Sequence, residues 1–105
     1  MKFIFAAVVL ALSVPSMASV KCQPDYIKGV QIKANGEVVY TTASGVRRGV
    51  GKFQNNPGVQ FMVQTLFLAV EKRLHVQVAY PDGFNCDAEN TQAAAEWVYI
   101  QNAGG

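Results

Sequence analysis

Two cysteines limit the fold of this chain more than any other feature. Cys22 and Cys86 are its only cysteines, and His75 is its only histidine. These three residues cannot supply the four Cys or His ligands of a structural zinc site. In an oxidising compartment a pair of cysteines forms a disulfide more often than a reactive thiol or a metal site. We therefore expect a Cys22–Cys86 bridge, which would stabilise a small domain by roughly 4 kcal/mol on the chain-entropy model.

The first 18 residues contain the three parts of a secretory signal peptide. Lys2 supplies a positive charge, an apolar run follows as far as Val14, and Ser16-Met17-Ala18 places small residues before a cleavage site. The alternative is a membrane anchor, but the apolar run of about twelve residues is shorter than the roughly 20 that a spanning helix needs. We expect cleavage after Ala18, a bacterial secreted or periplasmic location, and one small domain over residues 19–105.

Charge and motifs argue against several classes of function. Nine Lys and Arg residues face seven Asp and Glu residues, a far weaker basic excess than a nucleic-acid-binding domain shows. The sequence has no Gly-x-Ser-x-Gly, no phosphate-binding loop and no cluster of metal ligands. Two of the acidic residues Asp82, Asp87 and Glu89 could form a catalytic carboxylate pair, but carboxylates near turns usually face water. We expect neither catalysis, nor a metal, nor a cofactor.

Alternating apolar residues and turn signals predict five strands. Asn35-Gly36 is a strong hairpin signal, because both residues tolerate the positive φ of a tight turn. Gly49 or Gly51 would allow a bend or bulge in the third strand. His75 falls on the polar side of the fourth strand. The fifth could instead begin helically at Ala93-Ala94-Ala95. The predicted strands are residues 26–33, 38–42, 46–53, 74–80 and 93–101.

One helix is predicted over residues 58–72. Asn56 is a good N-cap, and Pro57 suits the first helical position. Phe61 and Leu68 lie nearly opposite the main apolar face, so they are either scattered surface residues or a subunit interface. The predicted core-facing residues are Val59, Met62, Val63, Leu66, Phe67 and Val70.

The order β-β-β-α-β-β indicates a mainly β fold with one helix. It is the order of an OB-fold, a five-stranded Greek-key barrel with a helix between its third and fourth strands. Closure of the barrel would also remove exposed strand edges. The alternative is an open α+β sheet with the helix packed across it.

The cysteine positions and two longer segments carry a resemblance to a known family. A cysteine opens the expected mature chain in VKC, and the closing NTQAAAEWVYIQN is similar to the last strand of the cholera and heat-labile enterotoxin B subunits. The block GVQI…NGEVVY…FLAVEKRLHVQVAYPDG looks more like the pertussis and subtilase-cytotoxin B subunits. The chain thus resembles the B subunits of A-plus-five-B bacterial toxins. The resemblance implies an OB-fold that assembles into rings and binds cell-surface glycans.

These features suggest a secreted, non-catalytic, oligomeric binding subunit that recognises glycans or delivers a secreted A-type subunit. The resemblance implies a ring of five. Sugar sites combine an aromatic platform with convergent polar groups. Trp97 and Tyr99 could supply the platform, or they could be barrel core or subunit contacts. Arg47, Arg48 and Lys52 could bind an acidic sugar, or they could be a solvated strand edge. The alternative function is a small periplasmic OB-fold protein that binds another protein and is not part of a toxin.

Overall fold

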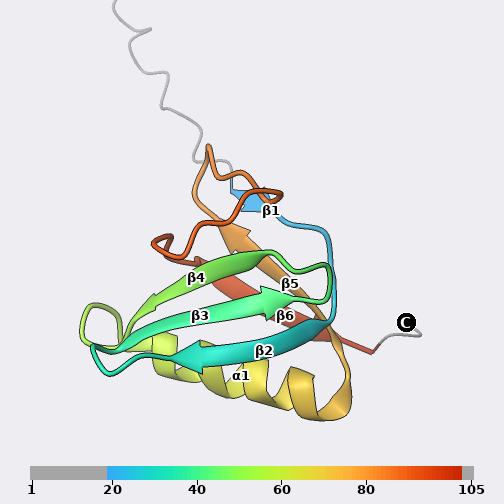
Figure 1. Cartoon of the computed structure of the whole chain (residues 1–105), viewed down its shortest axis with the longest axis horizontal. Coiled ribbons are helices and arrows are strands. Elements are labelled where there is room, and N and C mark those ends of the chain that lie inside the picture. Colours follow the sequence, from blue (N-terminus) through green and yellow to red (C-terminus); the bar gives the residue numbers. More distant parts are fainter. Residues whose placement is uncertain (1–18, 103–105) are drawn as a thin grey trace, which may run out of the picture.

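Six strands and one helix make up the regular structure of residues 19–102, the part of the chain that the computed structural model describes (Figure 1). The predicted signal peptide, residues 1–18, lies outside the described residues. Within those residues, no helix is both long and apolar enough to cross a membrane. The elements are β1 (Val20–Lys21), β2 (Ile27–Ile32), β3 (Glu37–Thr42), β4 (Arg47–Lys52), α1 (Gly58–Lys72), β5 (His75–Tyr80) and β6 (Trp97–Gln101).

The strands form two three-stranded antiparallel sheets with the orders β1-β5-β6 and β2-β3-β4. The mainly β fold with one helix is confirmed, and each of the five predicted strands is present. Sequence patterning missed β1, because its two residues are too few to show alternation; Val20 pairs with Tyr80 and Lys21 with Ala79. The strand pairings do not include a continuous five-stranded barrel.

Backbone hydrogen bonds join the two sheets along two seams. The segment before β2 runs beside β5: the Cys22 N–H donates to the Val78 carbonyl (3.1 Å), and Asp25 forms an isolated antiparallel bridge with Val76. On the other side, residues 90–95 run beside β4, where the Ala95 N–H donates to the Val50 carbonyl (3.0 Å). The outer edges of β2 and β6 have no partner strand among the described residues.

A bulge bends β4, as the sequence predicted. Val38 pairs with Gly51 and Val39 with Gly49, so Val50 is an extra residue opposite β3. Gly51 has a φ of 141°, a backbone conformation that residues with a side chain rarely adopt. The neighbouring segment of residues 90–95 requires glycine at position 49, because an added Cβ would lie 2.5 Å from the Ala93 carbonyl oxygen. Gly49 thus lets residues 90–95 approach β4 closely, whereas a Cβ on Gly51 would lie 2.9 Å from a methyl group of Val59 in α1.

Helix α1 has the predicted bounds but a narrower buried face. It buries Val59, Val63, Leu66 and Ala69. Phe67 and Val70, predicted to face the core, are 48% and 38% exposed. Each residue turns the helix by about 100°. Phe67, one residue after the buried Leu66, therefore lies outside the stripe that the two sheets cover. The N-cap of the helix is Pro57 and not the predicted Asn56, although Asn56 Oδ1 accepts a hydrogen bond from the Gly58 N–H (2.8 Å).

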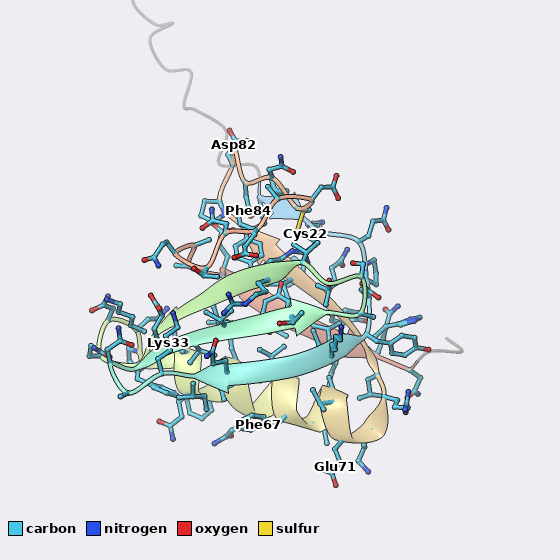
Figure 2. All side chains as sticks on the ribbon, viewed as in Figure 1. Cys22, Lys33, Phe67, Glu71, Asp82 and Phe84 are labelled. Carbon is cyan, nitrogen blue, oxygen red and sulfur yellow. A yellow bond between two sulfur atoms is a disulfide. The ribbon has the colours of Figure 1, made fainter. Side chains whose placement is uncertain are left out.

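The predicted disulfide between Cys22 and Cys86 is confirmed, and it closes a loop with a sequence separation of 64. Figure 2 shows it beside β1, where it ties the start of the domain to the segment that follows β5. In that segment, the Phe84 ring stacks on Tyr80 with a centroid distance of 3.8 Å. The bridge therefore anchors the long connection between β5 and β6.

Candidate functional site

A hollow with a volume of about 420 Å³ lies between α1 and β6, and we call it the aromatic hollow. Phe61 and Trp97, which are 68% and 36% exposed, both line it. Exposed aromatic side chains of this size are uncommon away from binding surfaces when they gather in one place. The residues that line the aromatic hollow are Asn56, Gly58, Phe61, Met62, Thr65, Glu96, Trp97 and Val98.

Regular backbone geometry explains why these aromatic rings are exposed. Successive strand residues face opposite sides, so Val98 and Ile100 of β6 pack against the core while Trp97 and Tyr99 face outward. On α1, Phe61 and Leu68 are seven residues apart and therefore lie on one face of the helix. Leu68 is 39% exposed. The predicted interface residues and the predicted aromatic platform thus lie on neighbouring elements.

A second, smaller space of about 140 Å³ shares Asn56 with the aromatic hollow, and we call it the polar cavity. Apolar atoms of Val50 and Val59 contribute to its wall, and Lys52 and Gln92 add polar groups. Four separate segments of the chain contribute to it. Its lining residues are Glu37, Val50, Gly51, Lys52, Asn55, Asn56, Val59, Thr91, Gln92, Ala93 and Ala94.

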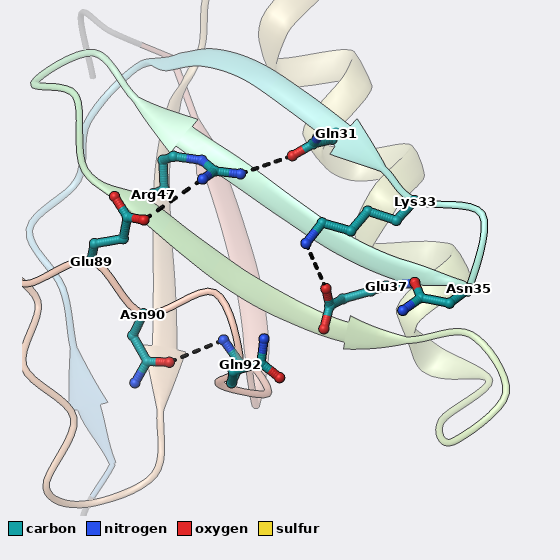
Figure 3. A network of polar contacts seen from close by, with 8 residues as sticks. All are labelled: Gln31, Lys33, Asn35, Glu37, Arg47, Glu89, Asn90 and Gln92. Atoms are coloured by element: carbon teal, nitrogen blue, oxygen red, sulfur yellow. Dashed lines mark hydrogen bonds and ion pairs between the residues drawn. The ribbon is translucent and has the colours of Figure 1, made fainter.

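Glu37 supplies the carboxylate of the polar cavity. It is only 7% exposed, and Lys33 Nζ lies 2.9 Å from its Oε1 (Figure 3). The hydrogen bond from Lys33 lowers the pKa of Glu37 and outweighs burial, which acts in the opposite direction; the charge of Lys52 lowers the pKa further. The carboxylate is therefore ionised at neutral pH. The Glu37 N–H also donates to Asn35 Oδ1 (3.0 Å), which fixes the start of β3.

Arg47 belongs to a polar network on the outer face of the β2-β3-β4 sheet. Its guanidinium donates to Gln31 Oε1 (2.9 Å) and lies 3.6 Å from Glu89 Oε2 (Figure 3). Half-exposed ion pairs of this kind contribute little to stability. The network ties the segment after Cys86 to β2 and β4, and Arg47 lines neither of the two hollows.

Arg48 lies in the interior instead. It is 8% exposed, its Nη2 donates to the Cys86 carbonyl (2.7 Å), and its Nη1 lies 3.5 Å from the Tyr40 hydroxyl. The Tyr80 hydroxyl donates to the Gly49 carbonyl (2.7 Å) and lies 3.0 Å from that of Tyr40. Burial raises the pKa of both tyrosines, so they stay neutral. Because its contacts are internal, Arg48 is not part of the candidate site.

The structure brings together only part of the ligand site expected from the sequence. Lys52 lines the polar cavity and Trp97 the aromatic hollow, whereas Tyr99 is 54% exposed farther along β6. Sequence patterning missed Glu37 and Gln92 as site residues, because Glu37 stood beside a turn and Gln92 in an irregular polar stretch. No local signal indicated that these two segments meet.

The other chemistry-bearing side chains do not assemble into a second site. Asp82 and Asp87 are exposed, and Glu89 pairs with Arg47. His75 is half-buried, with its ring 4.5 Å from that of Tyr26. Among residues 19–102, no three His, Cys, Asp or Glu side chains form a group that could hold a metal ion.

Comparison of the chain with protein-family models, with curated proteins and with solved structures found no match. The resemblance to toxin B subunits therefore stays a prediction from the sequence. The two adjoining hollows at the start of α1 and the open edges of β2 and β6 are the features from which a function can be argued.

Proposed function

We propose that this chain is a secreted, non-catalytic binding subunit that recognises cell-surface glycans through the aromatic hollow. The observation that carries the proposal is the exposure of Trp97 and Phe61 in one hollow, beside the polar side chains of Asn56, Thr65 and Glu96. An aromatic surface can cover the apolar face of a sugar ring, while a few placed polar groups fix its orientation. The disulfide is compatible with a location outside the cytoplasm.

An OB-fold-like barrel is part of the same proposal. Its support is the order of the elements and the two hydrogen-bonded seams, one between residues 22–25 and β5 and one between residues 90–95 and β4. In an OB-fold, one sheet continues into the next so that a small barrel forms. The resemblance to toxin B subunits adds the expectation of a secreted A-type partner subunit.

Replacement of Trp97 by alanine is expected to weaken glycan binding at least about tenfold, which corresponds to ~1.4 kcal/mol. The reason is that the substitution removes the larger ring of the aromatic hollow. Binding of the oxidised, folded protein is measured on a glycan array and then by calorimetry with the glycans that bind. Tyr26→Ala is the matched control, because Tyr26 is 38% exposed, close to the 36% of Trp97, but does not line the hollow.

Two outcomes would count against a glycan-binding function. One is the absence of any bound glycan on the array with folded wild-type protein. The other is equal affinity of the Trp97→Ala and Tyr26→Ala proteins, since the aromatic hollow would then have no part in binding.

We further propose that the chain forms a closed oligomer. The outer edges of β2 and β6 are unpaired and belong to different sheets. Exposed apolar side chains accompany both edges: Ile32 of β2 is 47% exposed, and Leu68 of α1, which does not line the aromatic hollow, is 39% exposed. A contact between two different surfaces produces a ring when the rotation closes. The number five comes only from the resemblance.

The mass of the oxidised protein in solution, measured by light scattering during size-exclusion chromatography, is expected to be a fixed multiple of the protomer mass. Leu68→Glu should lower it, because a charge buried in an apolar contact without a partner is costly. Gln60→Glu is the control, because it adds the same charge to an exposed position on the same helix. A monomeric wild-type protein would instead favour the alternative function, a small periplasmic protein that binds another protein and is not part of a toxin.

A further inference from the structure

The polar cavity has the size of a site for one small group rather than for a chain of sugars. Its volume is about 140 Å³, whereas sites for drug-sized ligands usually occupy about 300–1,000 Å³. It lies between β4, the start of α1 and residues 91–94. The buried Val50 and Val59 give it an apolar wall, and its other side chains are mostly polar.

A fixed anionic acceptor lies on one side of the cavity. Lys33 Nζ lies 2.9 Å from Oε1 of Glu37, and the Gln92 side chain also donates to this carboxylate. A carboxylate has about four lone-pair sites, so acceptor positions remain for a ligand. Because Glu37 is buried and held by Lys33 and by its own backbone bond to Asn35, little conformational entropy would be lost when it binds a hydroxyl group.

Hydrogen-bond donors surround the rest of the cavity. Gln92 already donates a side-chain hydrogen bond to Glu37, whereas within residues 19–102 no hydrogen bond or ion pair is found for the side chains of Lys52 and Asn55. A sugar hydroxyl can donate to Glu37 and accept from one of these groups at the same time. A ligand carboxylate would lie near the Glu37 charge, and a ligand ammonium near Lys52. A neutral ring with several hydroxyl groups avoids both repulsions.

The polar cavity and the aromatic hollow adjoin at Asn56, which lines both of them. We infer that the polar cavity is a separate subsite that takes one neutral, hydroxyl-rich sugar ring at the end of a glycan, while the next part of the glycan lies on Trp97. This inference rests on the proposed glycan-binding function and specifies the chemistry of the terminal ring.

Glu37→Gln tests the subsite, because it removes the anionic acceptor and keeps the size of the side chain. Calorimetry with a glycan that ends in a neutral ring is expected to show an affinity loss of at least about tenfold. Lys33→Gln is the matched control: it breaks the same ion pair but leaves the carboxylate in place. Because Lys33 holds the carboxylate but is not itself the acceptor, the affinity of Lys33→Gln should fall by no more than about threefold, clearly less than that of Glu37→Gln. Thermal unfolding of both variants shows whether each remains folded.

The outcomes separate the subsite from the proposed function. If Lys33→Gln loses as much affinity as Glu37→Gln, the ion pair and not the acceptor is responsible, and the inference is overturned. The inference is also overturned if Glu37→Gln and Lys52→Ala both keep wild-type affinity while Trp97→Ala loses it. A third contrary result is tighter binding of glycans with an acidic terminal ring than of neutral ones. In both of these cases the glycan-binding function itself stands. If the folded wild-type protein binds no glycan, both proposals fail.

Discussion

Replacing Cys22 or Cys86 with serine is expected to lower the free energy of unfolding by roughly 4 kcal/mol, because each change opens the same covalent loop and increases the entropy of the unfolded chain. For a domain of this size, that is a large share of the total stability. Urea denaturation of the oxidised protein and of each variant measures the loss. Both single variants should lose the same amount, and the double variant should lose little more.

Reduction of the wild-type protein provides an independent control for the disulfide. A reducing agent should lower the melting temperature of the wild-type protein towards that of the Cys22→Ser, Cys86→Ser double variant and should not change the double variant. The loss falls on the connection between β5 and β6, which is also held by the hydrogen bond from Arg48 to the Cys86 carbonyl and by the hydrogen bonds of residues 90–95 to β4. Alkylation of Cys86 in the native, unreduced protein would contradict the bridge.

Gly49→Ala is expected to destabilise the protein by about 1–3 kcal/mol, as overpacking in a tight interior usually does. The added Cβ would lie 2.5 Å from the Ala93 carbonyl oxygen and 2.7 Å from that of Thr91. Both are backbone atoms, so the segment of residues 90–95 would have to move. That movement would break the hydrogen bond from the Gly49 N–H to the Asn90 carbonyl (2.8 Å).

Gly29→Ala is the matched control for this strand glycine. Gly29 also lies in a strand, but an added Cβ would meet no atom within 4 Å. Its effect should stay within about 0.5 kcal/mol. Because Thr91 and Ala93 line the polar cavity, Gly49→Ala should also weaken ligand binding, and Gly29→Ala should not. Equal unfolding free energies for the two variants would show that residues 90–95 adapt without cost.

The site illustrates what local patterns cannot provide. Trp97 and Lys52 were predicted as ligand residues from their chemistry alone, and the structure places them in adjoining hollows. Glu37 could not be predicted, because its role depends on Gln92, which is distant in the sequence. Arg47 and Arg48 are adjacent and were grouped for that reason, yet alternation along β4 places one on the outer network and the other in the interior.

In helix α1, the bounds could be predicted from local sequence, but the buried face could not. Its bounds follow from periodicity and from Pro57 at its start, which are local properties. Its buried face does not, because the face depends on where two sheets contact it. Phe67 and Val70 match the apolar period but lie outside the covered stripe, whereas the small Ala69 is buried.

Sequence patterns alone are enough to predict the Asn35-Gly36 hairpin, the helix over residues 58–72, the bulge near Gly49 and the Cys22–Cys86 pair. Each depends on neighbouring residues or, for the disulfide, on there being only one possible pair. Three other features emerge only from the folded chain: β1 pairs with β5, residues 90–95 lie along β4, and two hollows adjoin at Asn56. These features depend on contacts between segments far apart in the chain, which no local periodicity encodes.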